Sequence, residues 1–262
     1  MELSARVGFI KLVTRVLVLG LVFGPIASAQ AGAKLELDRA DFDFGLAPVN
    51  CTLVYQTWPR STGKDTLEIA DIKTGCSCLS VPLEKNRLAP GDSVELTFQW
   101  HVGPIVGKVE RAPYLFSNDN SGPHRLSLRT DLVLPESRTS SVYCRPQKIS
   151  FDAGDRRKDN RRVFTIQNDT DRDQALSLAT YTEDAFYLEL PDTVAAGSPA
   201  TGIVILQSGL TDSAFEGSFT LEFRGIDETV SRVSVAVSRG DFSFRPAVTT
   251  SMNTPDDENI KR

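Results

Sequence analysis

The stretch Leu67–Phe98, LEIADIKTGCSCLSVPLEKNRLAPGDSVELTF, decides how this chain folds. Apolar and polar residues alternate over short runs in it, which is typical of β-strands with one buried face. The first two runs are separated by Gly75-Cys76-Ser77-Cys78, and the third follows a turn at Ala89-Pro90-Gly91-Asp92. The stretch therefore predicts a strand, a Cys-x-Cys corner, a second strand, a turn and a third strand.

The same alternation extends on both sides of this stretch. Gly, Pro, Asn, Asp and Ser gather in the breaks between the runs, where turns need them. Eight short strands within about a hundred residues predict an immunoglobulin-like β-sandwich. We expect these strands near Lys34–Asp38, Asp41–Phe44, Val49–Trp58, Thr66–Lys73, Cys78–Leu83, Ser93–Trp100, Lys108–Ser117 and Arg125–Leu134.

The second half of the chain repeats this layout weakly. Ile149-Ser150-Phe151-Asp152 resembles Phe42-Asp43-Phe44-Gly45, and no second Cys-x-Cys occurs. A period of about a hundred residues is far longer than that of solenoid repeats, so it indicates tandem domains. The sequence predicts an all-β protein of two immunoglobulin-like domains. These are residues 30–134 and 142–240, with a linker at 135–141 and a polar tail at 241–262.

The N-terminal 29 residues have the features of a signal peptide. Arg6, Lys11 and Arg15 form a basic region, Val16–Phe23 is apolar, and Ala27-Ser28-Ala29 resembles a cleavage site. The apolar run is too short to span a bilayer. We therefore expect residues 1–29 to be removed, leaving no membrane span. The mature protein is then exported, to the periplasm or out of the cell.

Composition narrows the range of functions. The chain is 40% hydrophobic and 24% charged, which suits a packed globular protein. Its net charge of −5 argues against binding to nucleic acid, which needs a concentrated basic surface. The sequence shows no motif that pairs a nucleophile with a base. We therefore expect a protein that is not an enzyme, has no cofactor and binds a protein or another envelope component. The sequence leaves the oligomeric state open.

Several motifs of the first domain resemble a known family. They occur in order as Asp41-Phe42-Asp43-Phe44-Gly45, Leu67-Glu68-Ile69, Gly75-Cys76-Ser77-Cys78, Leu88-Ala89-Pro90-Gly91-Asp92-Ser93 and Phe116-Ser117-Asn118-Asp119. The chain resembles exported bacterial proteins of the domain-of-unknown-function family numbered fifteen seventy-three, although these usually have Ser-Cys-Gly-Cys at the corner. The resemblance implies an immunoglobulin-like fold similar to ASH-type and major-sperm-protein domains. It implies no activity.

The four cysteines, Cys51, Cys76, Cys78 and Cys144, are candidates for disulfides because the protein is expected to be exported. Residues i and i+2 of an extended strand lie about 6.6 Å apart along the strand, so we expect Cys76 and Cys78 to have different partners. Strand directions bring all four cysteines to the end of the first domain that meets the linker. We expect two disulfides of open connectivity, with one free pair or incomplete pairing as the structural alternative, and hypothesise that one disulfide ties Cys144 to the first domain.

Two other uses of the corner are possible chemically. Paired thiolates select Cu(I) or Zn(II), so the alternative function is a soft-metal protein that binds through Cys76 and Cys78. Thiol–disulfide exchange is disfavoured, because exchange enzymes usually present Cys-x-x-Cys at a helix N-terminus and no helix is expected here. The contact surface of a binding protein with this fold is expected on an edge strand or in the groove between the domains.

Overall fold

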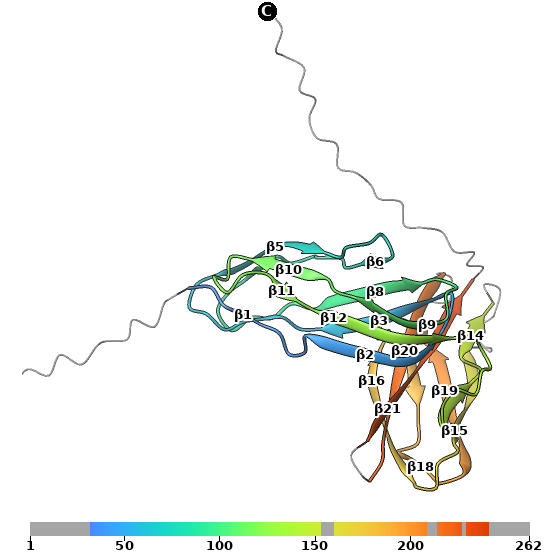
Figure 1. Ribbon diagram of the computed structural model, residues 1–262. Coiled ribbons are helices and arrows are strands. Elements are labelled where there is room, and N and C mark those ends of the chain that lie inside the picture. Colours follow the sequence, from blue (N-terminus) through green and yellow to red (C-terminus); the bar gives the residue numbers. More distant parts are fainter. Residues whose placement is uncertain (1–31, 153–159, 209–213, 227–228, 241–262) are drawn as a thin grey trace, which may run out of the picture. The chain divides into compact units, whose positions relative to one another are not determined.

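The computed structural model describes residues 32–152, 160–208, 214–226 and 229–240 (Figure 1). Every element within these ranges is a β-strand, as the alternation predicted. The predicted signal peptide, 1–29, and the predicted tail, 241–262, lie outside the described residues. Searching the described part of the chain finds no helix with the length and apolar character to cross a bilayer.

The first sandwich consists of twelve strands between Leu35 and Val133. One layer contains two strand groups, with the orders β9-β12-β2 and β11-β10-β5-β7. The other layer has the order β3-β8-β6. The strands are β1 Leu35–Glu36, β2 Asp41–Pro48, β3 Cys51–Thr57, β4 Arg60–Ser61, β5 Leu67–Lys73, β6 Leu79–Ser80, β7 Arg87–Leu88, β8 Leu96–Val102, β9 Gly107–Arg111, β10 Tyr114–Ser117, β11 His124–Arg125 and β12 Ser127–Val133.

Aromatic residues join the two layers of the first sandwich. Phe42 of β2 stacks on Tyr55 of β3 with ring centroids 4.5 Å apart. Phe44 lies 6.1 Å from the ring of Trp100 on β8. All four side chains are buried. Because residues two apart on a strand share a face, the pair Phe42 and Phe44 places that face of β2 against the core.

The second sandwich consists of nine strands between Val142 and Arg239. Its layers have the orders β18-β16-β20-β21, with β14 beside β21, and β13-β15-β19-β17. Phe219 packs between them, with its ring 5.2 Å from Phe164 and 6.2 Å from Phe186. The strands are β13 Val142–Arg145, β14 Lys148–Phe151, β15 Arg161–Asn168, β16 Gln174–Tyr181, β17 Phe186–Glu189, β18 Thr193–Val194, β19 Ser198–Leu206, β20 Phe215–Arg224 and β21 Val230–Arg239.

The weak sequence repeat has a counterpart in the strand pairing. In the first sandwich β2 is parallel to the last strand, β12, and in the second β14 is parallel to the last strand, β21. The two sandwiches are also joined directly. Leu46 of β2 pairs with Val233 of β21, so one eight-stranded sheet runs through both. The chain therefore forms two immunoglobulin-like sandwiches that share a sheet.

A β-bulge makes this junction possible. Phe44 and Gly45 together oppose Thr130 of β12, so β2 has one extra residue there. Gly45 has a φ of +65°, in the left-handed region that favours glycine. The carbonyl of Gly45 accepts a hydrogen bond from Thr130 Oγ1 at 2.9 Å, and that of Phe44 accepts one from Ser234 Oγ at 2.8 Å. Ser234 belongs to the second sandwich, so the bulge connects the two.

The second sandwich also covers the outer edge of β3. The backbone N–H of Val54 donates to Ser218 Oγ at 2.8 Å, and its carbonyl accepts from Thr180 Oγ1 at 3.3 Å. Thr52 Oγ1 donates to Glu216 Oε2 at 2.6 Å. Ser218 and Thr180 thus occupy backbone groups of Val54 that an edge strand would otherwise leave open.

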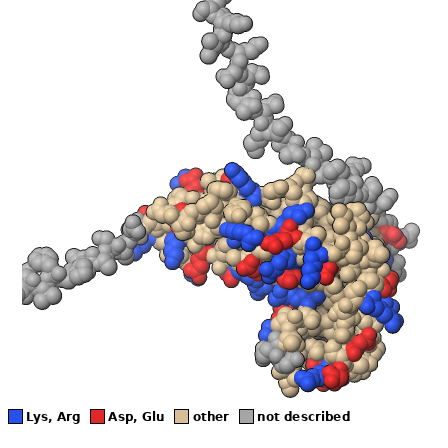
Figure 2. Space-filling view, viewed as in Figure 1, with Lys and Arg blue, Asp and Glu red and all other residues tan. Residues whose placement is uncertain are grey.

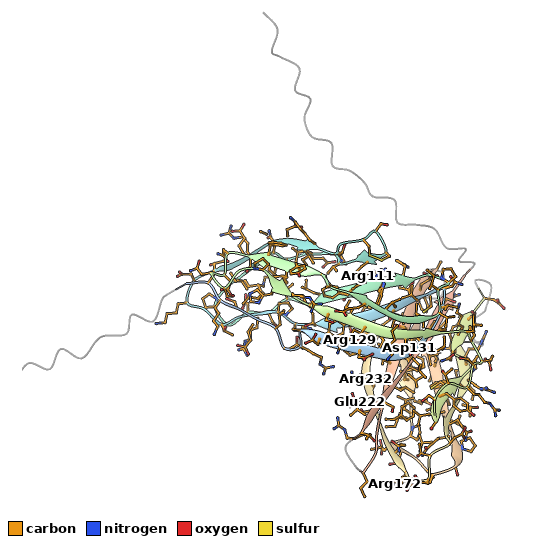
Figure 3. The ribbon with its side chains drawn as sticks, viewed as in Figure 1. Arg111, Arg129, Asp131, Arg172, Glu222 and Arg232 are labelled. Atoms are coloured by element: carbon orange, nitrogen blue, oxygen red, sulfur yellow. A yellow bond between two sulfur atoms is a disulfide. The ribbon has the colours of Figure 1, made fainter. Side chains whose placement is uncertain are left out.

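An arginine and a glutamate complete the junction. Arg232 donates to Glu222 Oε2 from Nε at 2.9 Å and from Nη2 at 2.6 Å. It also donates from Nη1 to the carbonyl of Asp43 at 3.2 Å and lies 5.3 Å from the ring centroid of Phe42. Figure 3 shows Arg232 and Glu222 side by side below β2. Burial raises the pKa of Glu222, but hydrogen bonds from Arg232 and Arg224 outweigh it, so the pKa lies below its ordinary value.

We expect the protein to lose stability in acid partly through this glutamate. A carboxyl whose pKa is lower in the folded protein stabilises it above the ordinary pKa, and this contribution is lost as the pH falls through the folded value. The window therefore lies below pH 4.5. Urea unfolding at a series of pH values measures it. Glu222→Gln should be less stable than wild type at neutral pH and lose less stability in acid; parallel profiles for the two proteins would contradict the assignment.

Candidate functional site

The structure joins Cys76 to Cys78 and leaves Cys51 and Cys144 as free thiols. This differs from the expectation of two disulfides in which Cys76 and Cys78 have different partners, and it agrees with the alternative that one pair stays free. The segment between β5 and β6 is not extended, because Gly75 has a φ of +77° and turns the chain. The Cα atoms of the bonded pair are consequently 5.2 Å apart, within the usual range for a disulfide.

Cys144 has a different environment from the one expected. It lies on β13 within the core of the second sandwich and is 1% exposed. Burial raises the pKa of its thiol. The hypothesis that Cys144 ties the linker to the first domain is therefore not met in this structure. Hydrogen bonds and the shared sheet join the sandwiches instead.

Cys51, the first residue of β3, lies at the junction. Its thiol donates to the carbonyl of Pro48 at 3.0 Å. It lines a cavity of about 290 Å³ together with Lys148 and Glu216. Burial raises the pKa of Cys51 to about 12, although the charge of Lys148 acts in the opposite direction. The thiol is thus protonated at neutral pH and is a weak nucleophile.

The disulfide lies beside an arginine at the end of β9. Arg111 Nε donates to Cys78 Sγ at 3.2 Å. The guanidinium of Arg111 lies 5.7 Å from the ring centroid of Trp100, and its Nη1 donates to the carbonyl of Glu110 at 2.8 Å. The backbone of Cys78 is fixed as well, because its carbonyl accepts from the N–H of His101 at 2.8 Å. Figure 3 labels Arg111.

The sequence analysis did not find Arg111. It is separated from Cys78 by 33 residues, and no motif connects the two. Only the pairing of β9 with β12 and of β6 with β8 brings them together. Without the fold, no feature of the sequence could have selected this arginine from the others.

The disulfide contributes little to folding stability. A bond that closes a ring of three residues restricts the unfolded chain by about 1.6 kcal/mol, against about 3 kcal/mol for a fifteen-residue loop. The expected role of the cysteines was to staple the first domain and the linker. The bonded pair cannot do so, since it connects residues only two apart in the chain.

Next to this corner, β9 forms a free edge of the sheet. Its only partner among the described strands is β12, and it ends the order of the eight-stranded sheet. Lys108 and Glu110 of β9 are exposed. Just before the strand, Ile105 and Val106 are 75% and 54% exposed. A free strand edge thus lies between an exposed apolar pair and the disulfide corner.

The sheet face beside this edge carries charges of both signs. Arg129 of β12 is opposite Glu110 of β9, and Asp131 is opposite Lys108. These residues and Asp43 line a hollow of about 420 Å³. Figure 2 shows the basic and acidic side chains gathered on this face. The pKa of Glu110 lies below its ordinary value, chiefly because Arg125 and Ser127 donate hydrogen bonds to it.

The alternative of a soft-metal site also concerned Cys76 and Cys78. Their sulfur atoms are bonded to each other, so in this oxidation state neither is a thiolate that could bind a metal. Across the described residues, no three His, Cys, Asp or Glu side chains gather as a metal site would require.

Comparisons with solved structures find distant similarities. A protease of Vibrio cholerae, VesB, is 16% identical with a TM-score of 0.32, covering 37% of this chain and 31% of the protease chain. The ASH/PapD-like domain 7 of human CEP192 is 8% identical with a TM-score of 0.34, covering 50% of this chain and 100% of that one. The E. coli chaperone DraB is 11% identical with a TM-score of 0.32, covering 78% and 98%.

A search of the curated proteins finds no match. A family model matches residues 35–132, the span from β1 to the penultimate residue of β12, which includes the Cys-x-Cys corner. The resemblance noted in the sequence motifs is confirmed over this span. The first sandwich therefore matches the family described as "Protein of unknown function (DUF1573)".

Proposed function

We propose that this protein is an exported, non-enzymatic binding module of the cell envelope that takes up an extended polypeptide segment along β9. The observation that carries this proposal is the free edge of β9 in a sheet that is otherwise anchored in two cores. The signal-like residues 1–29 support export. An edge strand offers a row of backbone donors and acceptors to which an extended segment can add.

Of the described edge strands, β9 is the best suited to such a partner. β6, β7, β11 and β18 have two residues each, and β13, β14 and β17 have four. β3 is longer, but Ser218 and Thr180 of the second sandwich occupy its outer edge. Among the described strands that end a sheet and are not covered by another element, β9 is the longest, with five residues.

The surroundings of β9 indicate the chemistry of the segment. Ile105 and Val106 offer apolar contact before the strand begins. The alternating charges of Lys108 and Glu110 favour a segment with polar side chains of both signs on the solvent side. Val109 packs against the core and holds the strand in place, so the edge is formed before a partner arrives. A prearranged edge lowers the entropic cost of binding.

Binding should therefore depend on the apolar pair. The probe is a display library of random peptides, panned on the immobilised protein, from which one enriched peptide is synthesised. The double variant Ile105→Asp with Val106→Asp should weaken its binding at least about tenfold, because the bound peptide would no longer bury two apolar side chains. In the wild-type protein, the peptide should slow hydrogen exchange of the amides of Lys108 and Glu110.

Ile226→Asp is the matched control. Ile226 lies in the second sandwich and is 83% exposed, so a change of the same kind, at one position instead of two, is made away from β9. It should leave binding unchanged. Equal loss in both variants, or protection that falls on β17 or on the junction around Cys51 rather than on β9, would overturn the proposed binding edge.

A further inference from the structure

The Cys76–Cys78 bond differs from a structural staple in position and surroundings. It closes a very small ring, between a glycine with a left-handed backbone and the start of β6. Ser77 in the middle of the ring is exposed, and both cysteines are partly exposed. An added Cβ at Gly75 would meet no atom within 4 Å, so the approach on that side is open. The corner is therefore partly exposed and open on the Gly75 side to a thiol from solvent.

The surroundings of the two sulfur atoms are unequal. Arg111 Nε donates to Cys78 Sγ at 3.2 Å, and Cys76 Sγ has no such contact among the described hydrogen bonds. Stacking on Trp100 and a hydrogen bond to the carbonyl of Glu110 hold the guanidinium in place. When the bond opens, a thiolate at Cys78 would face a fixed positive charge. A stabilised thiolate is the better leaving group in exchange.

We propose that the Cys76–Cys78 disulfide is an exchange site for peptides with two cysteine thiols, and that attack occurs at Cys76. The first thiolate of the peptide forms a bond to Cys76 Sγ. The Cys76–Cys78 bond breaks, and its electron pair remains on Cys78 Sγ beside Arg111. This proposal does not depend on peptide binding along β9.

A second step completes the exchange. The other thiolate of the peptide attacks the peptide sulfur in the mixed disulfide, and the electron pair leaves on Cys76 Sγ, which takes a proton from water. The peptide dithiol is oxidised by two electrons to a disulfide, and the Cys76–Cys78 pair is reduced by two. One protein molecule thus oxidises one peptide. The fixed guanidinium of Arg111 takes the place of the helix N-terminus that exchange enzymes usually use.

The first test uses glutathione as a single-thiol probe. Oxidised protein is mixed with glutathione, quenched in acid and alkylated, and the cysteine-containing peptides are identified by mass spectrometry. We expect the glutathione adduct on Cys76 and the alkyl group on Cys78. Cys51 and Cys144 should carry no glutathione, because both are free thiols whose pKa values are raised by burial. Adducts on Cys78, or equally on both cysteines, would overturn the assigned site of attack.

The second test measures the rate of exchange. Arg111→Gln should react about three- to tenfold more slowly, because the leaving thiolate loses its positive neighbour. Arg111→Lys should recover part of the rate. Arg129→Gln, on the adjacent strand, is the matched control and should react as wild type does. Unfolding midpoints show whether each variant is folded. Equal rates for Arg111→Gln and Arg129→Gln would mean that Arg111 has no role in exchange.

The third test uses a peptide with two cysteines. Wild-type protein should yield one peptide disulfide per protein molecule, and Cys76→Ser should yield none. The double variant Ile105→Asp with Val106→Asp should react at the wild-type rate with this short peptide, which separates the present proposal from the binding function of β9. A wild-type disulfide that stays intact in excess dithiol peptide would refute the exchange site.

Discussion

Replacing Gly45 with alanine is expected to lower the free energy of unfolding by about 3 kcal/mol. A Cβ at this position would lie 1.9 Å from the carbonyl oxygen of Arg232 and 2.4 Å from its carbonyl carbon. These are backbone atoms of β21, so a side-chain rotation cannot relieve the overlap. The φ of +65° adds the cost of a left-handed conformation for an L-residue. Both costs act at the bulge that joins β2 to β21.

Gly197→Ala separates the two costs. Gly197 has a φ of +62°, but an added Cβ there would meet no atom within 4 Å. It should cost only about 1–2 kcal/mol, from the backbone conformation alone. Urea unfolding of both variants, followed by tryptophan fluorescence, gives the comparison. If the two alanines cost the same, the close approach of β2 to β21 does not contribute to stability.

Ser218→Ala is expected to cost about 1–3 kcal/mol, the usual penalty for leaving a buried hydrogen-bonding group without its partner. Ser218 and Val54 are both buried, and the N–H of Val54 donates to the serine hydroxyl at 2.8 Å. Alanine removes the acceptor and leaves too little room for water to replace it. The effect should reach the whole unit, since Val54 belongs to one sandwich and Ser218 to the other.

Ser150→Ala is the control for this prediction. Its hydroxyl lies 3.3 Å from that of Ser238 in an exposed position, where water can replace the lost contact. Its cost should be within about 0.5 kcal/mol of zero. Differential scanning calorimetry should show one transition for wild type, shifted down in Ser218→Ala. Two separate transitions in the wild-type protein would show that the sandwiches unfold independently and that this hydrogen bond does not couple them.

The alternation of apolar and polar residues predicted the sandwich architecture, because it indicates which side chains of each strand are buried. Phe42 and Phe44 stand two apart and both enter the core, as a strand with one buried face requires. The sharing of a sheet could not be predicted in the same way. The motif containing Gly45 is visible in the sequence, but its contact with Arg232 is not, since the two residues are far apart in the chain and neither carries a local signal of the other.

The candidate site was likewise predicted in part from the sequence. The Cys-x-Cys corner was identified as the principal chemical feature, but the distance between its cysteines was taken from an extended strand. The left-handed Gly75 invalidates that geometry. Cys144 does follow the linker, yet its side chain belongs to the second core. Which face of a strand receives a cysteine depends on register, and a count of strand directions does not contain that information.

The second sandwich covers the outer edge of β3, and this cover affects what a shortened chain would expose. The family match ends at residue 132, yet the partners of the Val54 backbone lie on β16 and β20. A gene fragment that encoded only the matched segment would produce a domain in which two strands, β3 and β9, have edges with unpaired backbone groups. Such a fragment would need a new cover for β3, from another domain or a second copy of itself. In this chain the second sandwich therefore supplies a cover that the matched segment lacks on its own.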